Sequence, residues 1–321
     1  MKDQHYRNVN IECIDPVCFP DVALFIKSGG NYVLYKPQER KFTEVDRQRL
    51  QRNNTDILYV RSGDIDALTE YMEENLTSTM ARDDIGSYSK GKILYQTSVN
   101  YVIELFETPD KLADIARCEN LTRQLIQFVT MEKNALSSLK SIIENNYYVF
   151  VHSVQVTALT LLMNAELYML DRDELLDVGV GALLHDLGMT FISNEIFDKP
   201  DALSDMEYYA VKRHAEKGYD FLKQKGGFSE TSLSIVHHHH EKFDGYGYPS
   251  MLKGNAIPRS VQVTTLCDVY CALTTDRVYR KATAPKEALR MMKEESPGSY
   301  NEELLQRFVE VMGTIVREKD Q

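Results

Sequence analysis

The sequence lacks tryptophan and is poor in cysteine, and this scarcity narrows the class of protein. Its five cysteines are Cys13, Cys18, Cys118, Cys267 and Cys271, an odd number in which no Cys-x-x-Cys pair occurs. Secreted domains that depend on disulfides usually carry an even, closely spaced set. The cysteine pattern therefore favours reduced thiols in an intracellular protein.

Long apolar runs and an excess of positive charge are also missing. The first twelve residues lack the apolar run of a signal peptide, and the most apolar stretch, Ala158–Leu170, is too short to span a bilayer. The net charge of −11 argues against general nucleic-acid binding, which needs a cationic surface. We expect a cytoplasmic protein without a membrane span, in which metal ions or clustered arginines provide the local positive site for any anionic substrate.

The 321 residues are enough for two domains with their own cores. Before residue 80 the chain has short β-type runs, a hairpin turn at Gly29-Gly30-Asn31 and two helices, one after Thr43 and one after Ser62. The β-type runs are residues 9–14, 23–27, 32–36 and 57–60. We expect a small α+β domain over residues 1–80 that senses, dimerises or docks, followed by a linker and connecting helices over residues 81–145.

From about residue 99 onward the pattern is helical. Two capping boxes, Asp171-x-x-Glu174 and Ser204-x-x-Glu207, predict one helix that reaches His185 and another that runs through His214 and Phe221. Pro258 suits the first turn of a further helix, and apolar residues between 304 and 316 mark one face of an amphipathic helix. The predicted fold class is mainly α, with an all-α helical bundle over residues 146–321 and a small N-terminal α+β domain.

Seven of the eight histidines fall between residues 152 and 240. They are His152, His185, His214 and the run His237–His240, and Asp186 and Asp268 accompany them. Taken singly, His152 reads as a buried, hydrogen-bonded core histidine, and the run of four resembles a purification tag. However, the run is internal, and Asp244–Pro249 follows it, which no tag supplies. Ligands contributed by several helices are typical of a metal site at the centre of a bundle.

Two motifs resemble a known family. His185-Asp186, with His152 upstream and Asp268 downstream, resembles the H…HD…D signature of the HD superfamily of metal-dependent phosphohydrolases. The segment H-H-E-x-x-D-G-x-G-Y-P, from His239 to Pro249, resembles the HD-GYP branch, whose members are cyclic di-GMP phosphodiesterases. The resemblance covers about 140 residues, does not extend to the first 80, and implies an HD-type helical bundle.

The resemblance also implies two divalent metal ions, with iron expected first and manganese next. One ion would be held by His152, His185, Asp186 and Asp268; the other would share Asp186 and be completed by His214, His239 and His240. Imidazole and carboxylate ligands without thiolate suit these metals. Some members hold a third ion with a carboxylate at the position where this chain has Tyr148, so we expect a binuclear site. The resemblance implies His185 and Asp186 as catalytic residues.

Substrate contacts are implied by the same resemblance. Gly247 would let the backbone approach a ligand closely, Tyr248 would stack on a guanine, and Arg277 and Arg280 would contact phosphate or base. The alternative for the two arginines and Lys281 is an ordinary solvated run of charge.

Three positions depart from the family pattern: Met189 replaces the lysine of H-D-x-G-K, Cys271 replaces an aspartate and Ser250 replaces a glycine. The resemblance implies a cyclic di-GMP phosphodiesterase that forms pGpG, GMP or both. The alternative is a metal-containing cyclic di-GMP receptor that signals through its N-terminal domain. The retained ligand set favours the enzyme and Met189 favours the receptor, whereas the intact GYP segment disfavours a different HD-type nucleotide phosphohydrolase. A homodimer and signalling protein partners are compatible with the resemblance.

Overall fold

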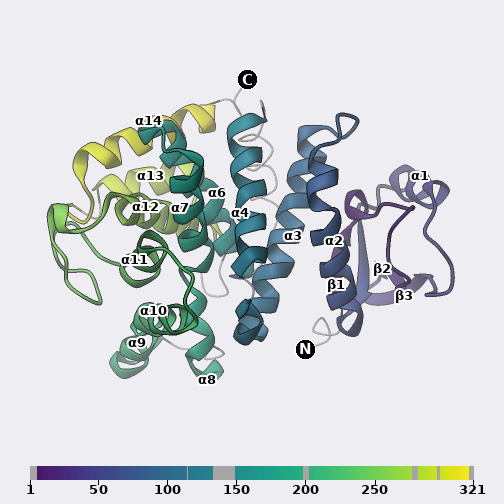
Figure 1. Ribbon diagram of the computed structural model, residues 1–321, viewed down its shortest axis with the longest axis horizontal. Coiled ribbons are helices and arrows are strands. Elements are labelled where there is room, and N and C mark those ends of the chain that lie inside the picture. The colour runs from purple at the N-terminus through teal and green to yellow at the C-terminus, as the bar shows by residue number, and fades with distance from the viewer. Residues whose placement is uncertain are drawn as a thin grey trace. The chain divides into compact units, whose positions relative to one another are not determined.

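The computed structural model describes residues 6–113, 115–132, 149–197, 202–276, 281–294 and 297–317 (Figure 1). The chain divides into two compact units, residues 1–101 and 102–321, and the division falls inside helix α3 (Ser87–Glu107). The predicted mainly α class with a small N-terminal α+β part is confirmed. The domain boundaries expected after residues 80 and 145 stay predictions.

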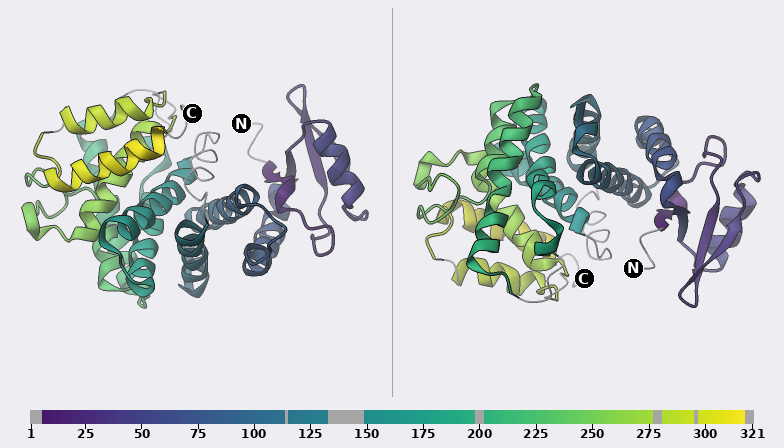
Figure 2. Two further views of the ribbon diagram at one scale, coloured as in Figure 1. Left: turned by 90° about the horizontal axis from the view of Figure 1, so that it is seen from above. Right: turned by 90° about the horizontal axis from the view of Figure 1, so that it is seen from below.

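The first unit is built on a four-stranded antiparallel sheet in the order β1-β4-β2-β3. Its strands are β1 (Tyr6–Asn10), β2 (Leu24–Ser28), β3 (Asn31–Lys36) and β4 (Ile57–Arg61). Helices α1 (Glu44–Arg52) and α2 (Ile65–Met80) lie on opposite sides of this sheet (Figure 2). Leu50 of α1 and Leu68 of α2 are both buried, as expected for helices that each cover part of a core.

Local chemistry explains where these strands turn and end. Gly29 and Gly30 have φ values of 54° and 80°, the positive values that a tight two-residue hairpin needs. Thr43 and Asp46 form the capping box that starts α1. The run predicted over residues 9–14 is a strand only to Asn10, because the Asn10 side chain accepts a hydrogen bond from Glu12 N at 3.0 Å and starts a 3-10 turn over Ile11–Cys13.

The second unit is a bundle of helices joined by short 3-10 turns (Figure 1). Its longer helices are α4 (Ile115–Met131), α6 (Val149–Tyr168), α7 (Arg172–Leu184), α9 (Asp205–Lys212), α10 (His214–Lys225), α11 (Glu230–His238), α12 (Arg259–Thr274), α13 (Pro285–Glu294) and α14 (Glu302–Arg317). The 3-10 turn η5 (Leu187–Phe191) follows α7, and the short helix α8 (Asn194–Phe197) follows η5. Other 3-10 turns are Pro109–Ala113 and Gly254–Ala256.

Helix α7 is the buried centre of this bundle and packs against α4, α6 and α11. From Leu175 to Leu184 every residue except Asp177 is apolar and buried, as expected for a helix enclosed on nearly all sides. A Cβ atom at Gly179 would press on the Thr122 side chain of α4, and one at Gly181 would lie 2.9 Å from Ser232 Cα of α11. The two glycines thus allow α4 and α11 to approach α7 closely, and this fixes the helix that ends at His185.

Both predicted capping boxes are present, at Asp171–Glu174 and Ser204–Glu207. The second helix does not run unbroken through His214, however. It stops at Lys212, and α10 begins at His214, because Arg213 forms a turn in which His214 Nδ1 hydrogen-bonds to Val211 O at 2.8 Å. The prediction of one continuous helix was wrong, and the break turns the His214 ring toward the interior.

Within the ranges that the structure describes, no helix is both long enough and apolar enough to cross a bilayer.

Candidate metal centre

Three helices and the ends of two others bring the seven predicted ligands together inside the second unit. His152 lies on α6, His185 ends α7 and Asp186 follows it in the turn before η5. His214 is the first residue of α10, His239 and His240 follow α11, and Asp268 lies on α12. The side chains form two groups with ligand atoms within 4.8 Å of one another: Asp186, His214, His239 and His240, and His152, His185 and Asp268. All seven therefore lie in one place, as the resemblance implied.

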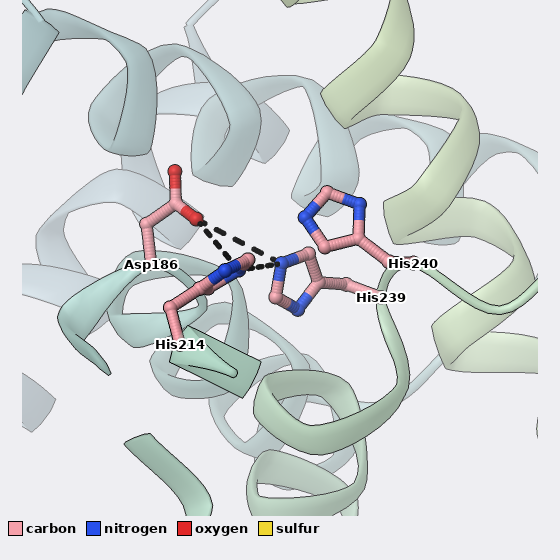
Figure 3. Close-up of side chains that lie close together, drawn as sticks. All are labelled: Asp186, His214, His239 and His240. Atoms are coloured by element: carbon pink, nitrogen blue, oxygen red, sulfur yellow. Dashed lines mark hydrogen bonds and ion pairs between the residues drawn. The ribbon is translucent and has the colours of Figure 1, made fainter. Parts of the chain in front are cut away.

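The first group faces one oxygen of Asp186 (Figure 3). Asp186 Oδ1 lies 3.3 Å from His214 Nε2 and 3.8 Å from His239 Nε2. The second group faces the other oxygen, because Asp186 Oδ2 lies 3.3 Å from His185 Nε2 and 3.9 Å from His152 Nε2. Two donors that share one ion at about 2.1 Å are roughly 3–4 Å apart, so each oxygen has the spacing of a ligand to its own ion.

The hydrogen bonds of the imidazole rings fix which nitrogen faces inward. The Nδ1 atoms of His185, His214 and His239 contact the carbonyl oxygens of Ala182, Val211 and Val236 at 2.8, 2.8 and 3.0 Å. A carbonyl only accepts, so Nδ1 carries the proton and Nε2 presents a lone pair to the centre. This is the tautomer that metal-binding histidines adopt.

The inward Nε2 atoms of His214 and His239 face each other, and neither carries a proton that could form a hydrogen bond between them. His214 Nε2 and His239 Nε2 are 3.1 Å apart, although both rings already donate through Nδ1. Burial lowers the pKa of His239 well below its ordinary value, which keeps that ring neutral. His185 Nε2 is buried and has no hydrogen-bond partner among the described residues. One cation between the His214 and His239 rings and a second beside His185 would satisfy these lone pairs.

The negative charges of Asp186 and Asp268 also favour the binding of cations. Burial opposes ionisation of Asp186 and Asp268, yet the surrounding imidazoles hold the pKa of both carboxyl groups below the usual range. Burial likewise works against charge on His185, but Asp186 and Asp268 outweigh it and raise the pKa of His185 to about 9. Without an ion, a proton therefore occupies His185 Nε2, and a bound cation would replace that proton. No lysine or arginine of the described residues pairs with either carboxylate. The two buried negative charges and five nitrogen donors therefore fit divalent metal ions.

The loop after the histidine run carries Tyr248 and is held by Glu241, whose role the sequence did not reveal. The Glu241 side chain is fully buried, and its carboxylate accepts hydrogen bonds from Ser250 N at 2.6 Å and Leu252 N at 3.0 Å. Tyr248 N donates to His240 O at 3.2 Å, and the Tyr248 ring lies 4.7 Å from the His240 ring. Glu241 thereby ties the loop to the end of α11, where His239 and His240 lie.

Gly247 is needed for packing in this loop. A Cβ atom there would overlap the backbone of Glu241 and Lys242, so the loop folds back on itself only with glycine at this position. This contact accounts for the glycine without a ligand, and its role in substrate binding stays a prediction. Arg277 and Arg280 lie outside the described residues, as does Tyr148, so their expected roles also stay predictions.

Replacing Glu241 by glutamine is expected to loosen the loop and lower any turnover at the site by about tenfold or more. The amide supplies two N–H donors where the loop offers two N–H groups, so at least one backbone donor loses its acceptor; a lost bond to a buried charged group costs about 1.5–3 kcal/mol. Urea unfolding and metal analysis measure stability and occupancy. Glu216→Gln, an exposed change on α10, is the control, and equal behaviour of the two variants would remove Glu241 from this role.

Comparison with known proteins agrees with this geometry. A family model described as "HD domain" matches residues 123–304. The chain belongs to the HD domain family. The segment from His239 to Pro249 places it in the HD-GYP branch, and this confirms the family expected from the motifs.

Named relatives and one solved structure extend the comparison. The chain is 33% identical over 200 residues to "Cyclic di-GMP phosphodiesterase PA4108" of Pseudomonas aeruginosa, covering 62% of this chain and 48% of the relative. It is 36% identical over 147 residues to "3'3'-cGAMP-specific phosphodiesterase 3" of Vibrio cholerae, covering 46% and 32%. The chain thus matches less than half of the length of either relative. The structure of Bd1817, an HDG"Y"P protein from Bdellovibrio bacteriovorus, is similar in fold, with a TM-score of 0.70, 18% identity, and coverage of 96% of this chain and 99% of that one.

Proposed function

We propose that this protein is a metal-dependent phosphodiesterase that hydrolyses cyclic di-GMP to pGpG, GMP or both. The observation that carries the proposal is the position of Asp186, whose two carboxylate oxygens each face a separate group of imidazole nitrogens. Such a carboxylate suits a pair of ions, and the ligand set leaves room on them for water and phosphate. Relatives that bear the name of cyclic di-GMP phosphodiesterases support the choice of substrate.

The seven side chains would hold two divalent ions, with iron first and manganese next. Ions bound there supply Lewis acidity to a phosphate oxygen and lower the pKa of bound water. The protein's own side chains orient these groups. The Nδ1–carbonyl hydrogen bonds keep the Nε2 atoms directed inward. Glu241 holds the loop that places the Tyr248 ring beside His240. Tyr248 offers a flat face at the edge of the site on which a guanine can stack.

Anaerobic incubation with Fe²⁺ or Mn²⁺ and cyclic di-GMP tests the proposal, with products separated by chromatography. We expect linear pGpG or GMP to appear, and faster loss of cyclic di-GMP than of 3'3'-cGAMP. Tight binding of cyclic di-GMP without product would establish the receptor alternative instead. Neither product nor binding would refute both.

Met189 is the observation that favours a receptor, because the thioether places no charge directly after Gly188. If this limits the rate, Met189→Lys should raise kcat for cyclic di-GMP by about tenfold or more, since one electrostatic donor is worth about 3–4 kcal/mol in a transition state. Metal content should stay unchanged. Met131→Lys, at an exposed position on α4, is the matched control. A kcat that stays level or falls in Met189→Lys would show that Met189 does not limit turnover.

A further inference from the structure

Lys212 ends α9 next to the candidate metal centre, two residues before the predicted ligand His214. Its Nζ atom lies 5.0 Å from the centre of the Tyr208 ring and 5.7 Å from the centre of the Tyr248 ring. The Tyr248 ring in turn lies 4.7 Å from the His240 ring. An ammonium group, two phenol rings and the imidazole cluster are therefore contiguous.

The surroundings of Lys212 differ from those of two nearby cations, Arg213 and Lys225. Arg213 pairs with Glu216, and Lys225 pairs with Asp110. In the part of the chain that the structure describes, no carboxylate lies within ion-pair distance of Lys212 Nζ. The faces of aromatic rings attract an ammonium group without accepting all three of its N–H donors. Lys212 is thus held in place by rings that leave it able to bind an anion.

The backbone near Lys212 contacts the backbone near Met189. Gly188 packs directly on the His214 carbonyl, where a Cβ atom would overlap the oxygen. Met189 follows Gly188 and Lys212 precedes His214 by two residues, so both positions lie within two residues of one close backbone contact. Position 189 carries no charge there, whereas position 212 does.

We propose that Lys212 binds a phosphate of the substrate at the edge of the metal centre, with Tyr208 and Tyr248 positioning its ammonium group. This inference rests on the proposed function. A cyclic dinucleotide carries two phosphodiester charges, and a centre that attacks one of them leaves the other to be neutralised elsewhere. The net charge of −11 makes a local cation necessary for that second charge.

The test compares Lys212→Gln, Lys212→Arg and the wild type, each loaded with Mn²⁺, using cyclic di-GMP and bis(4-nitrophenyl) phosphate. We expect Lys212→Gln to raise KM for cyclic di-GMP about tenfold while kcat stays within about twofold. The same variant should leave KM for bis(4-nitrophenyl) phosphate unchanged, because that diester has no second phosphate. Lys212→Arg should recover most of the binding, because it keeps the charge. Lys223→Gln, which removes one positive charge from exposed α10, should leave KM unchanged.

The outcomes separate this inference from the proposed function. If the wild type binds cyclic di-GMP without hydrolysing it, cyclic di-GMP is refuted as substrate, and the calorimetric Kd of cyclic di-GMP replaces KM in the comparison of the variants. Three results would overturn the role of Lys212: an unchanged KM or Kd for cyclic di-GMP in Lys212→Gln, an equal change in Lys223→Gln, or a wild type that does not bind cyclic di-GMP.

Discussion

Replacing Asp186 by alanine is expected to empty the metal centre and to lower any phosphodiester hydrolysis by at least about a thousandfold. Both carboxylate oxygens face imidazole nitrogens, so one substitution removes a ligand from each of the two groups. Divalent ions provide several kcal/mol of charge stabilisation in phosphoryl chemistry, and each 1.36 kcal/mol is a factor of ten in rate. Metal analysis and turnover of cyclic di-GMP measure the two effects separately.

Asp220→Ala is the matched control, because Asp220 is an exposed aspartate on α10 and not one of the seven side chains. It should keep full metal content and full activity. Circular dichroism of Asp186→Ala should match the wild type, because the Asp186 side chain caps no helix. Full activity after the loss of Asp186 would refute its assignment as the ligand common to both ions.

Gly188→Ala is expected to destabilise the fold by about 3 kcal/mol and to lower metal affinity at the same time. A Cβ atom at position 188 would overlap the His214 carbonyl oxygen, and its next neighbours are backbone atoms as well. Backbone atoms cannot rotate away, so η5 and α10 must separate, and overpacking of this kind costs about 1–3 kcal/mol or more. His214 begins α10, so its ring moves with the displaced backbone.

Gly313→Ala, the same substitution at another position, is expected to have the opposite effect on the stability of the fold. Gly313 lies inside α14, and a Cβ atom there meets nothing within 4 Å. Alanine favours a helix by about 1 kcal/mol over glycine, so this variant should be slightly more stable. Urea unfolding of both variants measures the difference. Equal stability of Gly188→Ala and the wild type would show that the close contact between η5 and α10 is not rigid.

The parts of the fold with strong local signals could be predicted from the sequence. The two capping boxes of the bundle, the Gly29-Gly30 turn and the apolar face of α14 each depend on neighbours in the chain. The seven candidate ligands could be selected from the sequence because their residue types match a family motif, and their role as ligands stays a prediction. Their convergence in space agrees with that interpretation.

Features that depend on distant contacts could not be predicted. The break at Arg213 follows from a side chain–carbonyl bond of His214, and periodicity along α9 and α10 does not reveal it. Glu241 is a letter of the GYP motif to which the sequence assigned no role, and the fold makes it a buried acceptor for the loop. In the sequence Lys212 is part of an ordinary charged segment. Only the fold places Tyr248, thirty-six positions later, beside its ammonium group.

The most direct test of the binuclear centre is a crystal structure of the Mn²⁺-loaded protein with anomalous scattering measured near the manganese edge. We predict two anomalous peaks per chain, one beside each oxygen of Asp186, with the first ion also touching His152, His185 and Asp268 and the second touching His214, His239 and His240. A single peak, a third peak of equal height, or two peaks that do not share Asp186 would contradict this centre.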